Sequence, residues 1–339
     1  PQHCVGVNLG GTTRHYKDSR GRLRVRWIPD SQVLGTPYDT LVPCFNTDMV
    51  NTMRLWSAGA TREFDFQVFN EGDYIRAVEG KTLSENISKV LYPNDVTPQG
   101  KELRLKQQYF FVSCSLQDIL RTQLFIHDNL DRLHERVAIQ LNDTHPSIAV
   151  AELMHLLIDR HLYPWDKAWE ITRNTLSYTN HTLLSEALET WPADLIGRLL
   201  PRHLEIINEI NRRFLDEVQV RFPKDEPRAA RMSIFQEGDQ KLIRMAHLAT
   251  VGSHAVNGVA ALHSQLMKKS LFKDFYEMWP EKFSNKTNGV TPRRWMMQCN
   301  PKLSFLISEK LGKGWVNDLD QLIGLEKYAN DPQFRETWQ

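Results

Sequence analysis

The sequence predicts an α/β protein built on a parallel sheet that is flanked by helices. Residues 137–141 form a short, mostly apolar and β-branched run, which is typical of a buried strand. A mostly apolar helical stretch follows at 148–158, and a second strand candidate lies at 175–179. Two strands joined by so long a crossover are expected to be parallel, in a right-handed unit.

Polar loops after these two strands predict a ligand site. Residues 142–145 follow the first strand, and Asn180 and His181 follow the second. Because parallel strands end at the same edge of a sheet, we expect these side chains to face one crevice, where open α/β sheets bind ligands. Amide, carboxylate, hydroxyl and imidazole groups suit a neutral ligand that carries many hydroxyl groups.

Local signals place the helices of this unit. Pro146 lacks an N–H and presets φ, so it suits the first turn of the helix at 148–158, which Asp143 or Thr144 is able to cap. A second helix around 165–171 leads into the second strand. Another helix is expected to begin near Ser185.

Shorter patterns predict the remaining elements. Alternating apolar residues predict strands at 23–28, 33–38 and 53–56. Helical spacing of apolar residues predicts helices at 73–90 (interrupted near Gly80), 103–121 and 245–269. Between the first two helices, two prolines and a glycine within residues 92–100 oppose regular structure.

Composition is that of an ordinary globular chain with one large domain or two. The chain has 339 residues, of which 41% are hydrophobic and 24% charged, with a net charge of +1. So small a charge argues against nucleic acid as a partner, and the longest apolar stretch is too short to cross a membrane. The four cysteines are far apart and form no CxxC pair, so we expect neither a metal site nor a disulfide framework, but reduced thiols in the cytoplasm.

Five segments resemble signature stretches of the α-glucan phosphorylases, which act on glycogen, starch or maltodextrin. They are RLW (54–56), VLYPND (90–95), QLNDTHPS (140–147), YTNHT (178–182) and NKTNGVTPRRW (285–295). The similarity runs in order from about Trp27 to the last residue, and five segments in family order are more specific than one motif. Because the chain is much shorter than that family's members, we expect an internal piece without the family's N-terminal start and most of its C-terminal domain.

The resemblance implies a fold and a reaction. The fold is of the GT-B type, with residues 1–288 as the latter part of the N-terminal glucan-binding domain and residues 289–339 as the beginning of the C-terminal domain. The reaction is phosphorolysis of terminal α-1,4-linked glucose units by inorganic phosphate, giving glucose 1-phosphate with retained configuration. The family's pyridoxal phosphate is held by a lysine that is not in this chain (Lys286 is not at that position), so the chain alone is expected to be inactive.

The resemblance also implies roles for individual residues. The two catalytic residues are His181, whose side chain meets the primary hydroxyl of the transferred glucosyl unit, and Asn288, which bonds the same unit. The substrate-binding residues are Asp143, His145, Tyr92, Asp95 and Glu186. Arg54 and Arg121 match effector-site arginines, but Thr122 replaces a neighbouring arginine of nucleotide-activated members, so we expect little nucleotide activation. The helix around residues 73–88 is expected to form a homodimer contact.

Plainer interpretations of these residues stay open. His181 is compatible with a structural histidine, Asn288 with a simple loop, Asp143 with a helix cap and Tyr92 with core packing. Glu186 and Glu189, three residues apart on one expected helix face, would also suit a glycoside hydrolase. A cofactor-free glucan-binding module is a further alternative.

Overall fold

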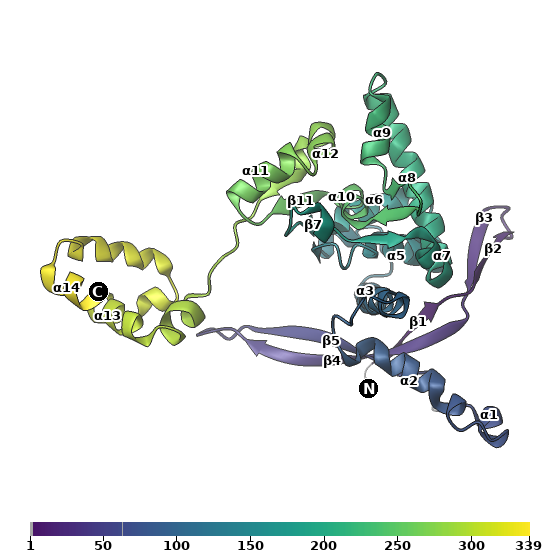
Figure 1. The fold of residues 1–339 in the computed structure, drawn as a ribbon, viewed down its shortest axis with the longest axis horizontal. Coiled ribbons are helices and arrows are strands. Elements are labelled where there is room, and N and C mark those ends of the chain that lie inside the picture. Colours follow the sequence, from purple (N-terminus) through teal and green to yellow (C-terminus); the bar gives the residue numbers. More distant parts are fainter. Residues whose placement is uncertain (1–2, 63) are drawn as a thin grey trace. The chain divides into compact units, whose positions relative to one another are not determined.

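The computed structural model describes residues 3–62 and 64–339, which form two compact units (Figure 1). The larger unit ends at Lys286, and the smaller one spans Thr287–Gln339. Each unit is described by itself. None of the helices in the described part of the chain combines the length and apolarity that a bilayer crossing needs.

A four-stranded parallel sheet lies in the larger unit, with strand order β12-β11-β7-β6. The strands are β6 (Ile139–Asn142), β7 (Leu176–Thr179), β11 (Ala255–Gly258) and β12 (Phe283–Asn285). All three neighbouring pairs are parallel, and Leu141 lies opposite Tyr178 in the pair that the sequence predicts. Leu141, Tyr178 and Val256 are buried, as in a sheet covered on both faces. The prediction of an α/β fold with parallel strands is confirmed.

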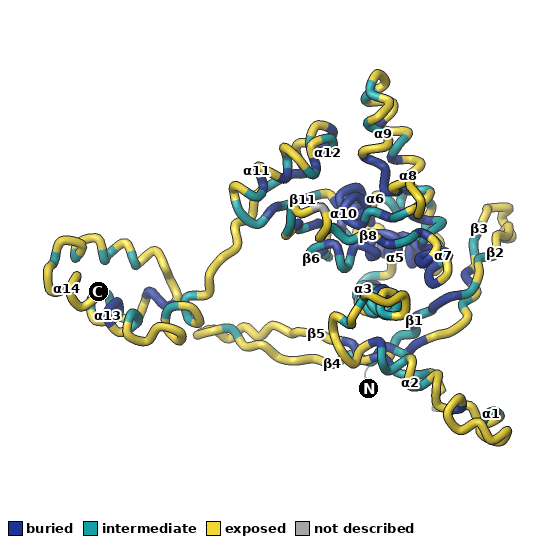
Figure 2. The backbone as a smooth tube through the Cα atoms, viewed as in Figure 1, coloured by how far each residue is buried: buried dark blue, intermediate teal, exposed yellow. Residues whose placement is uncertain are grey.

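Helices flank this sheet. They are α5 (Ala149–His155), which continues into the π-helix η1 (Leu156–Arg160), α6 (Trp165–Thr175), α10 (Met245–Val251) and α11 (Ala261–Lys269). Every residue of α5 and α10 is buried, which Figure 2 shows as dark blue segments at the centre of this unit. The helices predicted at 148–158 and 165–171 are therefore confirmed.

The helix predicted over 245–269 is wrong, because strand β11 divides it. Its apolar residues fit a buried strand as well as a buried helix, and periodicity alone does not separate the two over so short a run. A β-carbon at Gly252 would lie 2.5 Å from both γ-carbons of Val150. This glycine therefore lets the end of α10 lie directly against α5, where the chain turns into the strand.

Two further helix expectations need correction. Helix α2 (Arg76–Lys89) runs through Gly80 without the expected interruption. Helix α3 (Pro98–Ile126) includes residues 98–100, which were expected to be irregular, as well as the predicted 103–121. The Thr97 side chain accepts the Gly100 N–H, and Pro98 occupies the first turn, where its missing N–H costs nothing.

The fourth correction concerns the helix expected to begin near Ser185. One 3₁₀ turn, η2 (Ser185–Ala187), is followed two residues later by strand β8 (Thr190–Pro192). Glu186 and Glu189 therefore do not share a helix face, and the premise of the hydrolase alternative is wrong.

Antiparallel strands make up the N-terminal part of the chain. β1 (Val5–Leu9), β4 (Ser31–Pro43) and β5 (Val50–Ala60) form one sheet, and β2 (Thr12–Lys17) pairs with β3 (Leu23–Ile28). All three strands predicted here are confirmed. Phe110 and Leu116 lie on the buried face of α3, which contacts β1.

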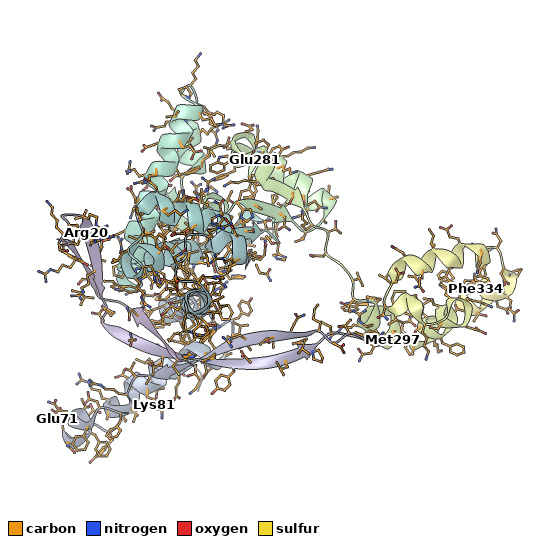
Figure 3. The ribbon with its side chains drawn as sticks, turned by 180° about the vertical axis from the view of Figure 1, so that it is seen from behind. Arg20, Glu71, Lys81, Glu281, Met297 and Phe334 are labelled. Carbon is orange, nitrogen blue, oxygen red and sulfur yellow. The ribbon has the colours of Figure 1, made fainter. Side chains whose placement is uncertain are left out.

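The remaining elements are short, apart from helix α8. In the larger unit they are α1 (Phe66–Asn70), α4 (Leu133–Arg136), α7 (Ala193–Leu199), α8 (Pro201–Arg221), α9 (Glu226–Met232), β9 (Phe235–Gln236), β10 (Leu242–Arg244), α12 (Lys273–Met278) and η3 (Pro280–Lys282). The smaller unit contains η4 (Arg293–Gln298), α13 (Pro301–Leu311), η5 (Gly314–Val316), η6 (Leu319–Tyr328) and α14 (Pro332–Trp338). Its own core is formed by Ile307, Trp315 and Val316, and Figure 3 labels Met297 and Phe334 in this unit.

Candidate active-site crevice

Polar side chains cross the carboxyl edge of the parallel sheet. Gln140 Nε2 donates a hydrogen bond to Thr179 Oγ1 (2.8 Å), and that hydroxyl donates to Asn257 Oδ1 (2.8 Å). These two hydrogen bonds connect β6, β7 and β11. They fix the ends of three strands at the edge where the sequence predicts the crevice.

The two predicted loops meet through His181 and Asn142. Nε2 of the His181 imidazole lies 2.7 Å from Oδ1 of Asn142, although 39 residues separate them in the sequence. The neighbouring Asn180 is fully buried, and its backbone N–H donates to the Asn257 carbonyl (2.9 Å). Residue 180 therefore anchors the backbone, while the exposed His181 side chain faces outward beside Asn142.

His263 is a further imidazole at this edge that the sequence prediction missed. Its Nδ1 accepts the Val259 N–H (3.2 Å), and its Nε2 is buried without a hydrogen-bond partner among the described residues. Burial lowers the pKa of His263, and the nearby His181 imidazole lowers it further. His263 follows β11, the strand that lies within the segment wrongly predicted as one helix (245–269).

Asp143 occupies a turn between β6 and the following helix. Its φ of 68° is left-handed, a conformation that aspartate tolerates better than most residues. Its N–H donates to the Thr179 carbonyl, and its Oδ1 accepts the Thr144 N–H at 2.6 Å. Helix α5 instead begins after Ile148, with no side-chain cap from any described residue, so the predicted capping by Asp143 or Thr144 is wrong.

Glu189 organises a second cluster beside His181. Its Oε1 accepts hydrogen bonds from Gln108 Nε2 (2.8 Å) and Arg104 Nη2 (3.3 Å). The other side of the Arg104 guanidinium holds Asp95 Oδ2 at 2.6 Å. Arg104 of α3 thus connects a carboxylate that precedes β8 with the 91–97 loop.

His145 and Tyr92 complete this cluster. Glu189 Oε1 lies 3.6 Å from His145 Nδ1, and this carboxylate raises the pKa of His145. The Tyr92 ring meets the His145 ring edge-on, with centroids 6.1 Å apart, and the Arg104 guanidinium lies 6.0 Å from the Tyr92 centroid. Three predicted site residues (Tyr92, Asp95 and His145) therefore lie together.

A pocket of about 300 Å³ lies within this cluster. Tyr92, Arg104, Asn142 and His145 line it, together with apolar residues of α3. Asn142 also holds His181, so this pocket adjoins the imidazole at the end of β7. Arg104 and Gln108 were not predicted as site residues, whereas Asn142 belongs to the polar loop at 142–145 that was expected to face the crevice.

Two further predicted site residues lie in other segments of the chain. Glu186 lies in η2 and is exposed. Asn288 is in the smaller unit, two residues after the larger unit ends.

Arg54 and Arg121, expected to be effector-site residues, converge on one carboxylate. Arg54 Nη1 lies 2.6 Å from Asp118 Oδ2, and Arg121 Nη2 lies 2.7 Å from Asp118 Oδ1. Arg54 also pairs with Asp39 through two nitrogens, at 2.7 Å each, and these carboxylates raise the pKa of Arg54. The Thr122 hydroxyl donates to the Asp118 carbonyl (2.8 Å).

Two cationic side chains, Arg104 and Lys286, are engaged by other groups of the protein. Arg104 binds Asp95 and Glu189, and Lys286 Nζ donates to Ser284 Oγ (3.2 Å) and to the Asn285 carbonyl (3.4 Å). These two side chains do not form a free cradle for a phosphate group. Among the residues that the structure describes, no group of three or more His, Cys, Asp or Glu side chains is arranged to hold a metal ion.

Comparison with known proteins agrees with this arrangement. The family model described as carbohydrate phosphorylase matches residues 1–339. The chain is 60% identical over 338 residues to the glycogen phosphorylase of Synechocystis sp., covering 100% of this chain. It is 52% identical to the glycogen phosphorylase of Chlamydia pneumoniae and to the muscle form of Bos taurus, over 99% and 98% of this chain.

These alignments cover 40%, 41% and 40% of the three relatives. The chain thus spans about 40% of the length of the curated relatives it matches. Because the family model matches every position, the resemblance predicted from five short segments is confirmed. The chain belongs to the carbohydrate phosphorylase family.

Proposed function

We propose that the whole protein is an α-1,4-glucan phosphorylase that cleaves terminal glucose units with inorganic phosphate and releases glucose 1-phosphate with retained configuration. The observation that carries the proposal is the meeting of two polar loops, where His181 bonds Asn142 beside the pocket of Tyr92 and His145. Amides and imidazoles at such an edge suit a ligand with many hydroxyl groups. Relatives at 52–60% identity named glycogen phosphorylase support the same reaction.

His181 is proposed to hold the transferred glucosyl unit. Because Asn142 Oδ1 is an acceptor, the proton of a neutral imidazole lies on Nε2, and Nδ1 is left to accept a bond from a substrate hydroxyl. The buried Asn180 fixes the backbone at this point. The backbone carbonyl of His181, held in this way, would stabilise the positive charge that develops at the anomeric carbon. Such an interaction lowers the barrier more than it strengthens ground-state binding.

The other residues are proposed in supporting roles. Asn288 bonds the same glucosyl unit, and the remaining substrate contacts come from Asp143, His145, Tyr92, Asp95 and Glu186. Residues 1–288 would belong to the glucan-binding domain and residues 289–339 to the start of the next domain. Pyridoxal phosphate would supply its own phosphate group as proton donor and acceptor. The engaged Arg104 and Lys286 do not fit that group, so no residue of this chain is assigned to it.

A homodimer through α2 is also proposed. Ile75, Val78 and Leu83 are exposed, although they lie on or just before a helix that would gain from covering them. The neighbouring Phe69 and Tyr74 rings meet edge-on, with centroids 4.9 Å apart, and are exposed as well. A cytoplasmic location fits the four unpaired cysteines of the described chain.

The test is the product that the whole protein releases from maltoheptaose in orthophosphate buffer. Phosphorolysis gives α-glucose 1-phosphate, which ³¹P NMR detects directly. Release of free glucose instead would show a hydrolase, and binding without any product would show a glucan-binding module. The chain of 339 residues, incubated with pyridoxal phosphate under the same conditions, is expected to give no product.

A further inference from the structure

A cavity of about 170 Å³ lies between helices α6 and α8, both labelled in Figure 1. Its walls include the indoles of Trp165, Trp169 and Trp279, and the buried side chains of Phe214 and Val251. An apolar cavity of about 150 Å³ is large enough to admit benzene. The space therefore fits one six-membered aromatic ring with a small substituent.

The cavity is separate from the crevice. Three of its lining residues stand shortly before parallel strands: Arg173 before β7, Val251 before β11 and Trp279 before β12. The amino ends of parallel strands lie at the opposite edge of the sheet from their carboxyl ends. The cavity thus lies toward the edge away from His181, and the proposed phosphorylase reaction does not use it.

Arg173 gives this aromatic cavity a positive charge that no described carboxylate neutralises. Its guanidinium lies 6.0 Å from the Trp169 ring centroid and 5.5 Å from that of Trp279. No described residue forms a hydrogen bond or an ion pair with it. By contrast, Arg213, the other arginine of the lining, is neutralised by Asp166 (2.8 Å) and Glu209 (2.6 Å).

Two more observations indicate an anionic aromatic ligand. The Trp165 Nε1–H is buried and meets no acceptor among the described residues, so this wall contains a second unused donor. The only carboxylate in the described lining, Glu217, is exposed. Apart from Glu217 the lining is aromatic, aliphatic or cationic, which leaves few acceptors for the hydroxyl groups of a sugar.

We propose that this cavity binds a single-ring aromatic carboxylate, with its ring among the three indoles and its carboxylate on Arg173. A guanidinium binds a carboxylate through two parallel N–H bonds, and indole faces favour stacked or edge-on contact with a second ring. Glu217 repels the ligand weakly from the exposed side.

The probe is benzoate, titrated into the purified chain by calorimetry, with benzamide, acetate and maltose as comparison ligands. Saturable millimolar binding of benzoate is expected. Benzamide should bind about tenfold more weakly because it lacks the charge, and acetate should not bind because it lacks the ring. Benzamide binding as tight as benzoate, absence of benzoate binding, or maltose displacing benzoate would overturn the proposal.

Three variants locate the binding. Arg173→Met keeps an apolar stem but should weaken benzoate binding at least tenfold. The matched control is Arg221→Met, which removes the same charge from the exposed end of α8 and should leave binding unchanged. Equal binding by Arg173→Met and wild type would contradict the proposal. Glu217→Gln removes the negative charge of an exposed side chain and should therefore tighten benzoate binding. This variant tests the proposal even if Arg173→Met fails to fold. Unchanged or weaker benzoate binding by Glu217→Gln would contradict the proposal.

Discussion

Oε1 of Glu189 lies 3.6 Å from Nδ1 of His145, a residue that lines the pocket beside the end of β7. The same oxygen accepts hydrogen bonds from Gln108 and Arg104 of helix α3. The Glu189 side chain is only 8% exposed, so its charge is poorly screened by water. The Glu189 carboxylate thus helps to position the His145 ring and raises its pKa.

Glu189→Gln should lower the pKa of His145, because it removes the negative charge that raises it. The glutamine side chain has nearly the same shape, so the pocket is expected to stay folded. Two-dimensional ¹H–¹⁵N NMR titration of the histidine rings measures the change. Glu186→Gln is the matched control, since Glu186 is exposed and lies in η2, and it should leave the His145 titration where it is. An unchanged pKa in Glu189→Gln would show that another group determines it.

Two glycines should respond to alanine in opposite directions. Gly252→Ala places a β-carbon 2.5 Å from the γ-carbons of buried Val150 and should destabilise the chain by about 1–3 kcal/mol. Gly80→Ala meets nothing within 4 Å in the middle of α2 and should stabilise it by about 0.5–1 kcal/mol. Urea unfolding monitored by circular dichroism gives both values.

The clash at Gly252 has its own control. Val150→Ala removes the two methyl groups that the new β-carbon would meet, so its cost and that of Gly252→Ala should not add in the double variant. If the two free-energy changes add strictly, Gly252 is needed for its backbone conformation and not to make room for Val150.

His247 should make the chain less stable in acid. Burial lowers its pKa to about 4, while the unfolded chain takes up the proton near pH 6.5. The unfolded state therefore binds more protons below pH 6.5, and the free energy of unfolding should fall by about 3 kcal/mol between pH 6.5 and pH 4. The stability that a neutral His247 contributes is fully present above pH 6.5.

His247→Gln separates this effect from that of the other buried histidines. Glutamine keeps an N–H donor for the Ser233 carbonyl, which His247 Nδ1 approaches at 3.0 Å, but it does not titrate. Urea unfolding at several pH values should show a flatter acid limb in the variant. Parallel curves for the two proteins would refute the assignment to His247.

Adenosine monophosphate should change the activity of the complete enzyme little. Arg54 and Arg121 are already engaged by Asp118, and Thr122 stands where the resemblance to nucleotide-activated members implies another arginine. Initial rates of glucose 1-phosphate formation with and without millimolar nucleotide measure this. Strong activation would show that these ion pairs open to admit a phosphate.

The sequence predicted the β6–β7 unit because its signals are local. Pro146 and the apolar runs around it identify a strand, a turn and a helix without reference to distant residues. The meeting of His181 with Asn142 also followed, because parallel strands place successive loops at one edge.

Strand β11 and the Glu189 cluster depend on tertiary contacts instead. The run around Val256 has the apolar pattern of either a helix or a strand, and the packing of Gly252 on Val150 becomes evident only in the folded chain. Likewise, 81 residues separate Gln108 from Glu189, and nothing in the spacing of the sequence pairs them. His263 was missed for the same reason, since it follows that strand.

The proposed function depends most on His181. In the complete enzyme its imidazole should bond the transferred glucosyl unit more tightly as the ring flattens toward the oxocarbenium ion. A hydrogen bond of this kind is worth about 0.5–1.5 kcal/mol, and more when a buried partner is left unsatisfied. His181→Ala should therefore lower kcat about tenfold or more, at roughly 1.4 kcal/mol for each decade.

The most direct test is steady-state kinetics of His181→Ala and His145→Ala in the complete enzyme, after circular dichroism confirms that both variants fold. The account predicts a loss of kcat in His181→Ala and a smaller loss in His145→Ala, whose pocket is proposed to lie beside the reacting carbon. A change confined to KM would indicate that His181 only binds the substrate. Wild-type turnover in His181→Ala together with lost turnover in His145→Ala would contradict the account and reverse the roles of the two loops.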